Sequence, residues 1–581
     1  MPQQLIRGDL ENGRRCAYDV VCTRMRIHID EIHMNEPTHA SSAQDPSALV
    51  GPERPAPASI SPWSPLRNPL FRGVWIATIV SNVGTWMQDV GAGWLMTSLS
   101  SSPSLVALVE AADSLPAMLL ALPAGALADI IDRRRLLIAV QVYLMVVTGA
   151  LGVLTLFNLT SAWALLGFTF ALGVGGAMMM PAWAAIVPDL VRNEELSSAV
   201  ALNSVAINVS RAIGPAIAGV LVAAVGPWLV FILNALSYIG VIAVLIRWRR
   251  EHRKSSLPAE RFLSAIRVGM RFVMHTRSLQ SVLVRGAAFF VFASATWSLF
   301  PLVVRRELMR GPEVYGLLLT CIGIGAIGGA MILPRLRAKM SRDTLVAGAS
   351  ALYALAALVL GHVQSVALLA FAMLMTGVAW ISILSALQVS AQLTLPPWVR
   401  ARGLAAFVMI FMGGMALGSI LWGQVATLIS IPAALTAAAV GMVLAIPVTW
   451  RLKLGVHQVL DFTPTMDWPM PVLAEAPEPD VPVMVTIIYR IQPDKRAEFV
   501  GAMQQVREMR RRNGAYFWQM FHDSEDPTRF VETFMDESWM EHLRQHERAS
   551  VSDRDIQRRA KQYLLPGTDT RSSHWLGDRE S

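Results

Sequence analysis

Twelve long apolar segments constrain this chain more than any other feature. They span residues 72–98, 104–128, 136–157, 162–187, 197–223, 227–247, 283–304, 313–334, 343–362, 365–390, 402–427 and 431–450. At about 1.5 Å per residue, each is long enough to cross ~30 Å of hydrocarbon as a helix. A helix is also the form that satisfies every backbone hydrogen bond within one such segment. The sequence therefore predicts an all-α polytopic membrane protein with twelve transmembrane helices.

The composition agrees with a membrane protein that has polar ends. Of the 581 residues, 54% are hydrophobic and only 16% are charged, whereas soluble domains carry about 25% charged residues. The net charge of +8 would suit nucleic-acid binding in a soluble protein. Here most basic residues flank the apolar segments, so the lipid bilayer explains them and we expect no nucleic-acid partner. The three cysteines form no CxxC pair and support neither a disulfide framework nor a zinc site.

The charges of the loops predict an orientation. The loops after segments 2, 4, 6, 8 and 10 carry arginines, and those after segments 1, 3, 5, 9 and 11 carry no Lys or Arg. By the positive-inside rule, both termini lie in the cytoplasm of a cell whose inner (plasma) membrane holds the chain. The loop after segment 7 disagrees, because it holds Arg305, Arg306 and Arg310. Those arginines either line an outward vestibule that meets an anionic cargo or anchor the helix at the interface.

Changes of composition divide the chain into parts. The predicted parts are a disordered cytoplasmic leader (1–68), a first six-helix bundle (69–247), a cytoplasmic middle loop (248–282), a second six-helix bundle (283–455), a Pro-rich linker (456–482), a soluble α+β domain (483–566) and a tail (567–581). The leader is rich in proline and has no apolar core of the kind that a secretory signal peptide needs. In the middle loop, apolar residues recur at helical spacing between arginines, which predicts an amphipathic helix on the inner membrane surface.

The two predicted bundles share an internal repeat of small residues. The matching sets are Ser210, Gly214 and Gly219 in the fifth segment and Gly414, Gly418 and Gly423 in the eleventh. Both sets are spaced by four and then five residues. Such a repeat favours two pseudo-symmetric bundles around a central cavity.

The soluble domain is predicted to be ferredoxin-like. A strand at 483–491, a helix at 493–512, a hairpin of 516–522 with 529–534, and a helical region at 539–548 give a β-α-β-β-α order.

Two histidines of this domain have a spacing that can bind a metal. His542 and His546 lie on one helical face beside Glu541. No third ligand is evident in the sequence. We therefore predict a solvated helix face, no metal and no other cofactor.

Three carboxylates lie within apolar segments. Glu110 and Asp113 share one face of the second segment, and Asp89 lies in the first. A carboxylate at such depth must be paired or neutral. Side chains that take up and release a proton while they face a cavity predict proton coupling. Alternatively, Glu110 and Asp113 lie near the outer end of their helix and are simply hydrated.

A charged turn between the second and third segments predicts a conformational latch. Asp129 is too costly to leave facing lipid, so it must meet a cation or a helix N-terminus. Arg402, at the start of the eleventh segment, is the candidate partner, and Gly125 allows a neighbouring helix to approach closely. The predicted latch consists of Gly125, Asp129, Asp132, Arg133, Arg134 and Arg402.

The fifth segment holds one arginine among amides and a Gly-Pro pair. Arg211 needs a carboxylate, a carbonyl or an anionic ligand inside a membrane, and Asn203 and Asn208 add hydrogen-bonding groups. The Gly214-Pro215 pair loosens the helix and frees a backbone carbonyl. The segment either contacts cargo or is a packing kink with a structural arginine.

The latch stretch resembles the loop 2–3 signature of the major facilitator superfamily. Gly125, Leu127, Ala128, Asp129, Arg133 and Arg134 match it, while Ile130 and Asp132 depart from it. Gly214, Pro215 and Gly219 resemble the Gly-Pro-x-x-Gly-Gly signature of exporters, with Ala218 in place of one glycine. The resemblance implies two six-helix bundles that alternate access by rocking, and transport outward. The arginine that the family commonly carries in helix 4 is missing, so Arg211 is a candidate replacement.

The chain is most similar to the enterobactin-exporter and macrolide-efflux branch of that superfamily. This resemblance implies a secondary active exporter, driven by proton antiport, of small amphiphilic molecules such as siderophores or antibiotics. The C-terminal domain resembles antibiotic-biosynthesis-monooxygenase-like domains, and dimerisation through it is expected. An alternative is a membrane-tethered oxygenase whose product the helices expel. A third hypothesis is a membrane scaffold or sensor, against which the intramembrane carboxylates argue.

Overall fold

The computed structural model describes residues 61–248, 262–396, 398–454 and 481–577. The predicted leader up to residue 60 and most of the predicted linker lie outside these residues. Side chains of a few further helical residues, including Asp129, are also outside the description.

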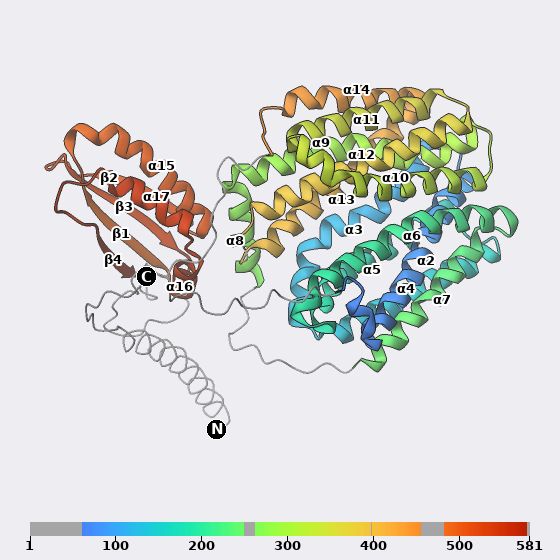
Figure 1. The fold of residues 1–581 in the computed structure, drawn as a ribbon, viewed down its shortest axis with the longest axis horizontal. Coiled ribbons are helices and arrows are strands. Elements are labelled where there is room, and N and C mark those ends of the chain that lie inside the picture. The colour runs from blue at the N-terminus through green and yellow to red at the C-terminus, as the bar shows by residue number, and fades with distance from the viewer. Residues whose placement is uncertain (1–60, 249–261, 397, 455–480, 578–581) are drawn as a thin grey trace, which may run out of the picture. The chain divides into compact units, whose positions relative to one another are not determined.

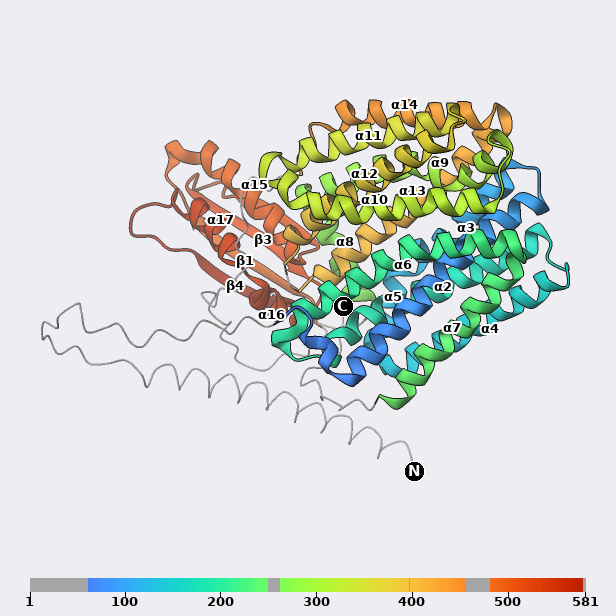
Figure 2. The same cartoon turned by 45° about the vertical axis from the view of Figure 1, so that its right-hand side comes forward.

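Twelve long helices form two groups of six (Figures 1 and 2). The first group is α2 (Pro69–Leu99), α3 (Pro103–Ile130), α4 (Arg133–Leu156), α5 (Ala162–Leu190), α6 (Leu196–Ala224) and α7 (Pro227–Arg247). The second group is α9 (Arg277–Leu302), α10 (Pro312–Lys339), α11 (Arg342–His362), α12 (Val366–Leu393), α13 (Arg400–Leu428) and α14 (Ile431–Thr449). The prediction of a mostly helical membrane protein is confirmed.

Eleven helices in the described part of the chain are long and apolar enough to cross a membrane. The remaining member of the two groups, α2, has 31 residues and packs against α6 and α7. It also carries Arg72, Asn82, Gln88 and Asp89, which lower its mean hydropathy. Its length and its packing among the other helices therefore indicate a twelfth span, although its composition is less apolar.

Proline and short polar side chains define where the helices begin. Pro69, Pro103 and Pro227 each stand in the first turn of their helix, where the missing N–H costs no hydrogen bond. The Asn68 side chain accepts a hydrogen bond from the Leu70 N–H at 2.9 Å and caps α2. These signals keep the loops short and hold consecutive helices antiparallel.

The second group begins earlier than the sequence predicts. Helix α9 starts at Arg277 rather than at residue 283, because Thr276 interrupts the helical backbone after α8 (Phe262–His275). Arg285, which stood near the start of the predicted segment, therefore lies about two turns inside a helix. A π-helical turn, η4 (Val303–Glu307), ends α9.

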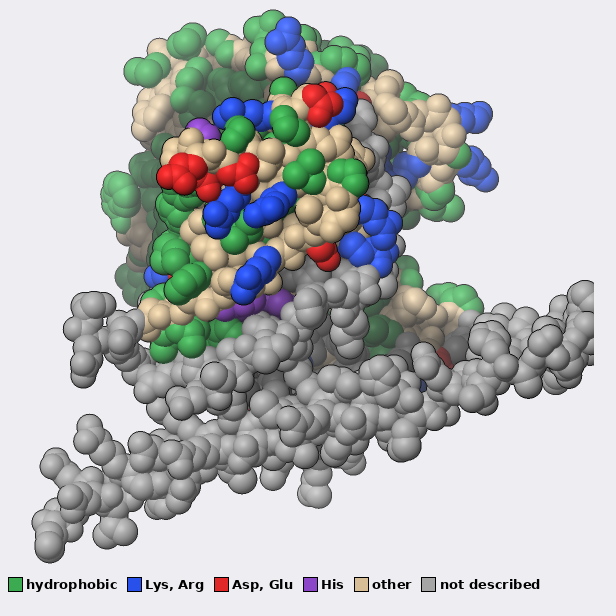
Figure 3. Space-filling view, turned by 90° about the vertical axis from the view of Figure 1, so that its left-hand side faces the viewer, with side chains coloured by type: hydrophobic (Ala, Val, Ile, Leu, Met, Phe, Trp, Pro, Cys, Tyr) green, Lys and Arg blue, Asp and Glu red, His purple; other side chains and the backbone are tan. Residues whose placement is uncertain are grey.

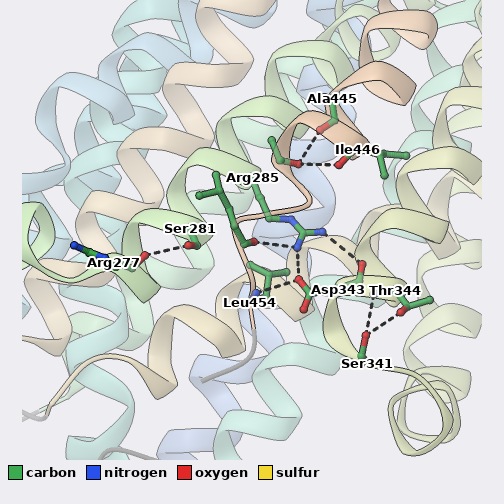
Figure 4. Close-up of polar contacts among 11 residues, drawn as sticks. Arg277, Ser281, Arg285, Ser341, Asp343, Thr344, Ala445, Ile446 and Leu454 are labelled. Carbon is green, nitrogen blue, oxygen red and sulfur yellow. Dashed lines mark hydrogen bonds and ion pairs between the residues drawn. The ribbon is translucent and has the colours of Figure 1, made fainter. Parts of the chain in front are cut away.

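A buried ion pair ties three parts of the second group together (Figure 4). Arg285 on α9 pairs with the Asp343 carboxylate in the first turn of α11. The same guanidinium donates to the Leu452 carbonyl at 3.3 Å, and Asp343 accepts from the Leu454 N–H at 3.0 Å. The pair therefore fixes the chain just after α14 to the ends of α9 and α11.

Helix α8 contacts the C-terminal domain through its basic side chains. Arg271 donates to the Glu537 carboxylate at 2.6 Å and to the Gly514 carbonyl at 2.9 Å, and Arg267 donates to Glu537 at 3.1 Å. Partial burial acts to raise the pKa of Glu537, but these two arginines outweigh it and lower that pKa. Arginines that we expected at the lipid surface are thus paired with protein.

The C-terminal domain is an antiparallel sheet with helices on one face. Its elements are β1 (Val483–Arg490), α15 (Arg496–Asn513), β2 (Phe517–His522), β3 (Arg529–Asp536), α16 (Trp539–Arg548), α17 (Val551–Lys561) and β4 (Arg571–Leu576). Within the described residues the strand order is β2-β3-β1-β4, which is the ferredoxin-like order. Figure 3 shows basic and acidic side chains interspersed over this side of the molecule, as on a water-exposed surface.

The predicted end of this domain at residue 566 is wrong. Strand β4 lies in the stretch predicted as a tail, and it pairs with β1 from Val483↔Leu576 to Ile488↔Arg571. The stretch has no clear alternation of apolar and polar residues, so its pairing could not be seen from the sequence.

A fully buried carboxylate organises the core under the sheet. Glu532 on β3 accepts hydrogen bonds from Arg510 Nε at 3.1 Å, the Tyr489 hydroxyl at 2.7 Å and Trp518 Nε1 at 2.9 Å. Burial and the Glu532 charge raise the pKa of Tyr489 well above its ordinary value. Every oxygen of the carboxylate thus has a partner, as a buried charge requires.

We expect Arg285→Ala to destabilise the protein strongly. The change leaves the half-buried Asp343 carboxylate without its partner, which costs up to about 3 kcal/mol, below the full penalty of a completely buried charge. Thermal unfolding of the purified protein in detergent measures it. Arg277→Ala on the same helix is the control, because its pair with Glu508 is exposed and worth at most about 1 kcal/mol. Equal unfolding temperatures for the two variants would contradict this account.

Candidate transport pathway

Two close helix crossings join the first group of helices to the second. Where α6 meets α10, a Cβ added to Gly316 would lie 2.3 Å from the Pro215 carbonyl oxygen and 2.8 Å from the Gly219 Cα. Where α13 meets α3, a Cβ added to Gly423 would lie 2.6 Å from the Ala107 Cβ. A side chain does not fit at such distances, so glycine is what lets the backbones approach this closely.

Equivalent members of the two glycine sets make equivalent contacts. Gly214 packs against Val83 of α2, the first helix of its own group, and Gly418 packs against Val291 of α9, the first helix of the other. The third member of each set meets the opposite group, as described above. The glycine spacing that repeats between α6 and α13 therefore corresponds to contacts that repeat between the two groups of helices.

Two arginines clamp the groups together at the end that holds the α2–α3 loop. Arg305 donates to Thr97 Oγ1 at 2.8 Å and lies over the Trp94 ring, 5.5 Å from its centroid. Arg306 donates to the Ser101 carbonyl. In this structure the two side chains bridge the groups of helices. The sequence analysis offered two other roles for them, an outward vestibule and an interfacial anchor.

Hydroxyl groups add a second contact at the same end. Ser104 Oγ lies 2.7 Å from Thr427 Oγ1 and 3.2 Å from the Gly423 carbonyl oxygen. Since Ser104 begins α3 and Thr427 ends α13, this contact holds the second crossing closed at the loop end.

The three intramembrane carboxylates come together between the two groups. Asp89, Glu110 and Asp113 are close enough to interact electrostatically, two to three turns or about 10–15 Å from their helix ends. Glu110 also interacts with Tyr353 of α11 and with Tyr315 of α10. Asp89 and Asp113 are exposed and Glu110 is half-buried, so the carboxylates are accessible although they have neighbours from the other group.

A buried polar network that the sequence argument missed lies behind Asp89. The preceding residue, Gln88, accepts from Asn234 Nδ2 at 2.8 Å and from Thr148 Oγ1 at 3.1 Å. Asn234 also donates to the Tyr238 hydroxyl at 3.3 Å. The network fixes the rotation of α2 against α4 and α7, and thereby the direction of the Asp89 side chain. The i, i+4 spacing of Asn234 and Tyr238 in an apolar helix was its only sequence signal.

The export-motif residues lie along α6 at its contacts with α2 and α10. Arg211 stacks on the Trp86 ring, 5.3 Å from its centroid. Its Nε is buried and has no hydrogen-bond partner among the residues that the structure describes. Asn208 donates to the Ser204 carbonyl of its own helix at 2.8 Å, and Asn203 is half-buried.

The predicted latch residues have several different roles. Asp132 caps α4 by accepting from the Arg135 N–H at 2.9 Å, and Arg134 donates to the Leu245 and Ile246 carbonyls at the end of α7. Among the side chains that the structure describes, a Cβ on Gly125 would meet nothing within 4 Å, so they do not show the close approach expected there. Arg133 is half-buried beside them.

The partner of the latch carboxylate stays a prediction. Arg402 packs against Gly269 of α8. The Asp129 side chain is outside the description, so the Asp129–Arg402 pair is not tested.

The solvated histidine face predicted for the C-terminal domain is wrong. His542 is buried, and His574 of β4 joins His542 and His546 in one cluster. Burial and the two neighbouring rings lower the pKa of His546 to about 3, and burial with His542 lowers that of His574 to about 4. A third possible ligand therefore exists, although the sequence gave no sign of it.

Two six-helix groups that repeat each other's contacts around shared carboxylates define a membrane transporter of the major facilitator type. The chain belongs to the family described as Transmembrane secretion effector, whose model matches residues 60–581.

Known relatives of the chain are transporters. It is 28% identical over 260 residues to the Staphyloferrin A transporter of Staphylococcus aureus (strain NCTC 8325 / PS 47), over 44% of this chain and 64% of that protein. It is 21% identical over 254 residues to Macrolide efflux protein A of Streptococcus pyogenes, over 42% and 61%. The match thus spans less than two thirds of each relative.

Solved structures share the fold at low identity. A bacterial homolog to the human lysosomal transporter Spinster, in an inward-facing and occupied conformation, matches 67% of this chain and 97% of its own, with a TM-score of 0.54 and 15% identity. A bacterial homologue of the iron transporter ferroportin matches 66% and 98%, with a TM-score of 0.51 and 14% identity.

We expect Gly316→Ala to weaken the α6–α10 crossing. The new methyl group would collide with the Pro215 carbonyl, and overpacking of this kind costs about 1–3 kcal/mol. Gly328→Ala on the same helix is the matched control, since a Cβ there meets nothing within 4 Å. It should be neutral or gain up to ~1 kcal/mol from helix propensity. Thermal unfolding in detergent compares them, and similar effects would refute the close crossing.

We expect a disulfide between Ser104→Cys and Thr427→Cys to stop transport. The two hydroxyls are in contact, and a covalent link prevents this end from opening. Oxidant should block efflux of a fluorescent dye from cells that carry the pair in a background without Cys16, Cys22 and Cys321, and reductant should restore it. Each single cysteine is the control. Continued efflux with the crosslink verified by mass spectrometry would show that this end need not open.

Proposed function

We propose that the chain is a proton-coupled exporter of small amphiphilic molecules that works by alternating access. The observation that carries the proposal is the set of Asp89, Glu110 and Asp113 between two groups of helices, where neighbours come from both groups. A protonatable cluster in that position gives each protonation state a different preferred conformation. The exporter-like Gly214-Pro215 and Gly219 contacts on α6 support the outward direction.

The contacts suggest how the cycle runs. The end with the α2–α3 loop is held by Arg305, Arg306 and the Ser104–Thr427 contact. By loop charge that end faces away from the cytoplasm, so this conformation receives cargo from the inside. Opening it breaks these few polar contacts, and pairing of Asp129 with Arg402 would then hold the cytoplasmic end closed. Few, exchangeable contacts at each end suit a two-state switch.

The cargo class follows from charge and from the relatives. One relative is named for a siderophore and another for macrolides, which supports a siderophore or an antibiotic as cargo. Three carboxylates favour an amphiphile with a basic group, while Arg211 is the cation that an anionic siderophore would meet. We place the chain in the inner (plasma) membrane with both termini in the cytoplasm.

The C-terminal domain supports dimerisation of the exporter. Helices cover one face of its sheet, and Phe517, Phe521 and Trp575 are exposed on strands of that sheet. Large exposed apolar side chains on one sheet face mark an interaction surface. The domain is proposed as a dimerising part of the transporter.

Everted membrane vesicles test the proposal. Uptake of candidate macrolides, siderophores and dyes is measured with and without a proton gradient. We expect Asp89→Asn to reduce the gradient-dependent uptake about tenfold or more, within the usual range of coupling between two sites. Glu194→Gln is the control, because Glu194 is an exposed carboxylate in the α5–α6 loop.

Two further variants separate coupling from binding. Glu110→Gln and Asp113→Asn should lower gradient-dependent uptake while the protein is inserted at wild-type levels. Full gradient dependence in a triple variant of Asp89, Glu110 and Asp113 would refute proton coupling through this cluster. Uptake into right-side-out cells instead of vesicles would refute export.

A further inference from the structure

Three histidines from two separate elements meet in the C-terminal domain. His542 and His546 lie on α16, and His574 lies on β4. One ring nitrogen of each lies within 4.8 Å of those of the other two. His542 Nε2 and His546 Nε2 are 3.2 Å apart.

The fold brings these side chains together for simple geometric reasons. Residues four apart on a helix lie one above the other, so His542 and His546 share a face of α16. His574 pairs with Val485 of β1, whose buried side chain faces the helices. Since paired residues point to the same face of a sheet, His574 points toward the helices as well.

The spacing of two of the three ring nitrogens suits a tetrahedral metal ion, and the His574 nitrogen lies within 4.8 Å of both. A zinc–nitrogen bond of about 2.0–2.1 Å places two ligand nitrogens about 3.3–3.4 Å apart. The observed 3.2 Å between the two Nε2 atoms agrees with this value. The rival interpretation is a plain hydrogen bond between the two rings.

A carboxylate orients the central histidine as in known zinc sites. Asp536, which is fully buried at the end of β3, lies 2.8 Å from His542 Nδ1. A carboxylate on Nδ1 keeps the proton there and leaves the Nε2 lone pair free to bind a metal. The direction of the His542 ring is therefore set before any metal binds.

Buried polar atoms around the cluster have no partner in the described part of the chain. They are Asp536 Oδ1, Trp539 Nε1, and both side-chain polar atoms of Gln545. Gln545 is 1% exposed and lies on α16 between the two histidines. Buried polar atoms are nearly always hydrogen-bonded. A metal-bound water at the cluster would be a partner for the nearest of these atoms.

We propose that His542, His546 and His574 bind one divalent transition-metal ion. The ion proposed is zinc, and a water molecule is its fourth ligand. Three imidazoles and a water are a known zinc donor set. Asp536 is a positioning residue that acts through His542. The metal would join α16 to β4 and stabilise the end of the domain. This site lies in the C-terminal domain and goes beyond the proposed function.

The test uses the full-length protein in detergent, with any polyhistidine tag removed and bound metal stripped by a chelator. After dialysis against zinc, inductively coupled plasma mass spectrometry should find one zinc per chain that His546→Ala and His574→Ala each lose. His522→Ala is the control, because His522 is an exposed histidine on β2, and it should retain the zinc. Zinc should also raise the unfolding temperature of the wild type and of His522→Ala alone.

Cobalt(II) provides a second readout and tests the positioning residue. Wild-type protein with cobalt should show the visible absorption of a tetrahedral ion. Asp536→Asn should weaken zinc binding by about 10- to 100-fold and shift that absorption, with circular dichroism unchanged. Zinc binding that is the same in the His546→Ala, His574→Ala double variant as in the wild type would overturn the proposal. Failure of the wild-type protein to bind zinc would also overturn the proposal. The contact between the two rings would then be a plain hydrogen bond.

Discussion

The structure depends on backbone approaching backbone where the two groups of helices cross. At Gly316 with Gly219, and at Gly423 with Ala107, a single methyl group more would force the helices apart. In a membrane, where lipid is as apolar as the side chains, close packing of this kind replaces the hydrophobic effect as the force between helices. Both crossings join opposite groups, so they hold the two groups of helices together.

Several polar contacts between the groups lie at the end that holds the α2–α3 loop. Arg305, Arg306 and the Ser104–Thr427 pair are all within reach of solvent at helix ends. Each can exchange its partner for water at small cost, whereas the glycine crossings cannot change gradually because packed surfaces have discrete arrangements. In the alternating access proposed above, the crossings would act as pivots and the arginine contacts would be the part that opens.

The sequence predicted features that depend on local pattern and missed those that depend on distant partners. The twelve spans, the glycine repeat and the ferredoxin-like order follow from periodicity and spacing. Nothing local indicated that Arg285 pairs with Asp343, which lies two helices away. In the same way, nothing local indicated that Arg305 reaches Thr97, or that the polar strand β4 brings His574 beside α16. The carboxylates were found because a charge in an apolar run is itself a local signal.

A chain of contacts connects the C-terminal domain to the transporter. Asp536, which holds His542, is followed by Glu537, whose carboxylate binds Arg267 and Arg271 of α8. Helix α8 in turn packs against Arg402 of α13 through Gly269. Asp536 and Glu537 are adjacent at the end of β3, so α16 and α8 both bind that strand end. Coupling along such a path requires an element with two arrangements that both sites bias. Helix α8 is the element that contacts both.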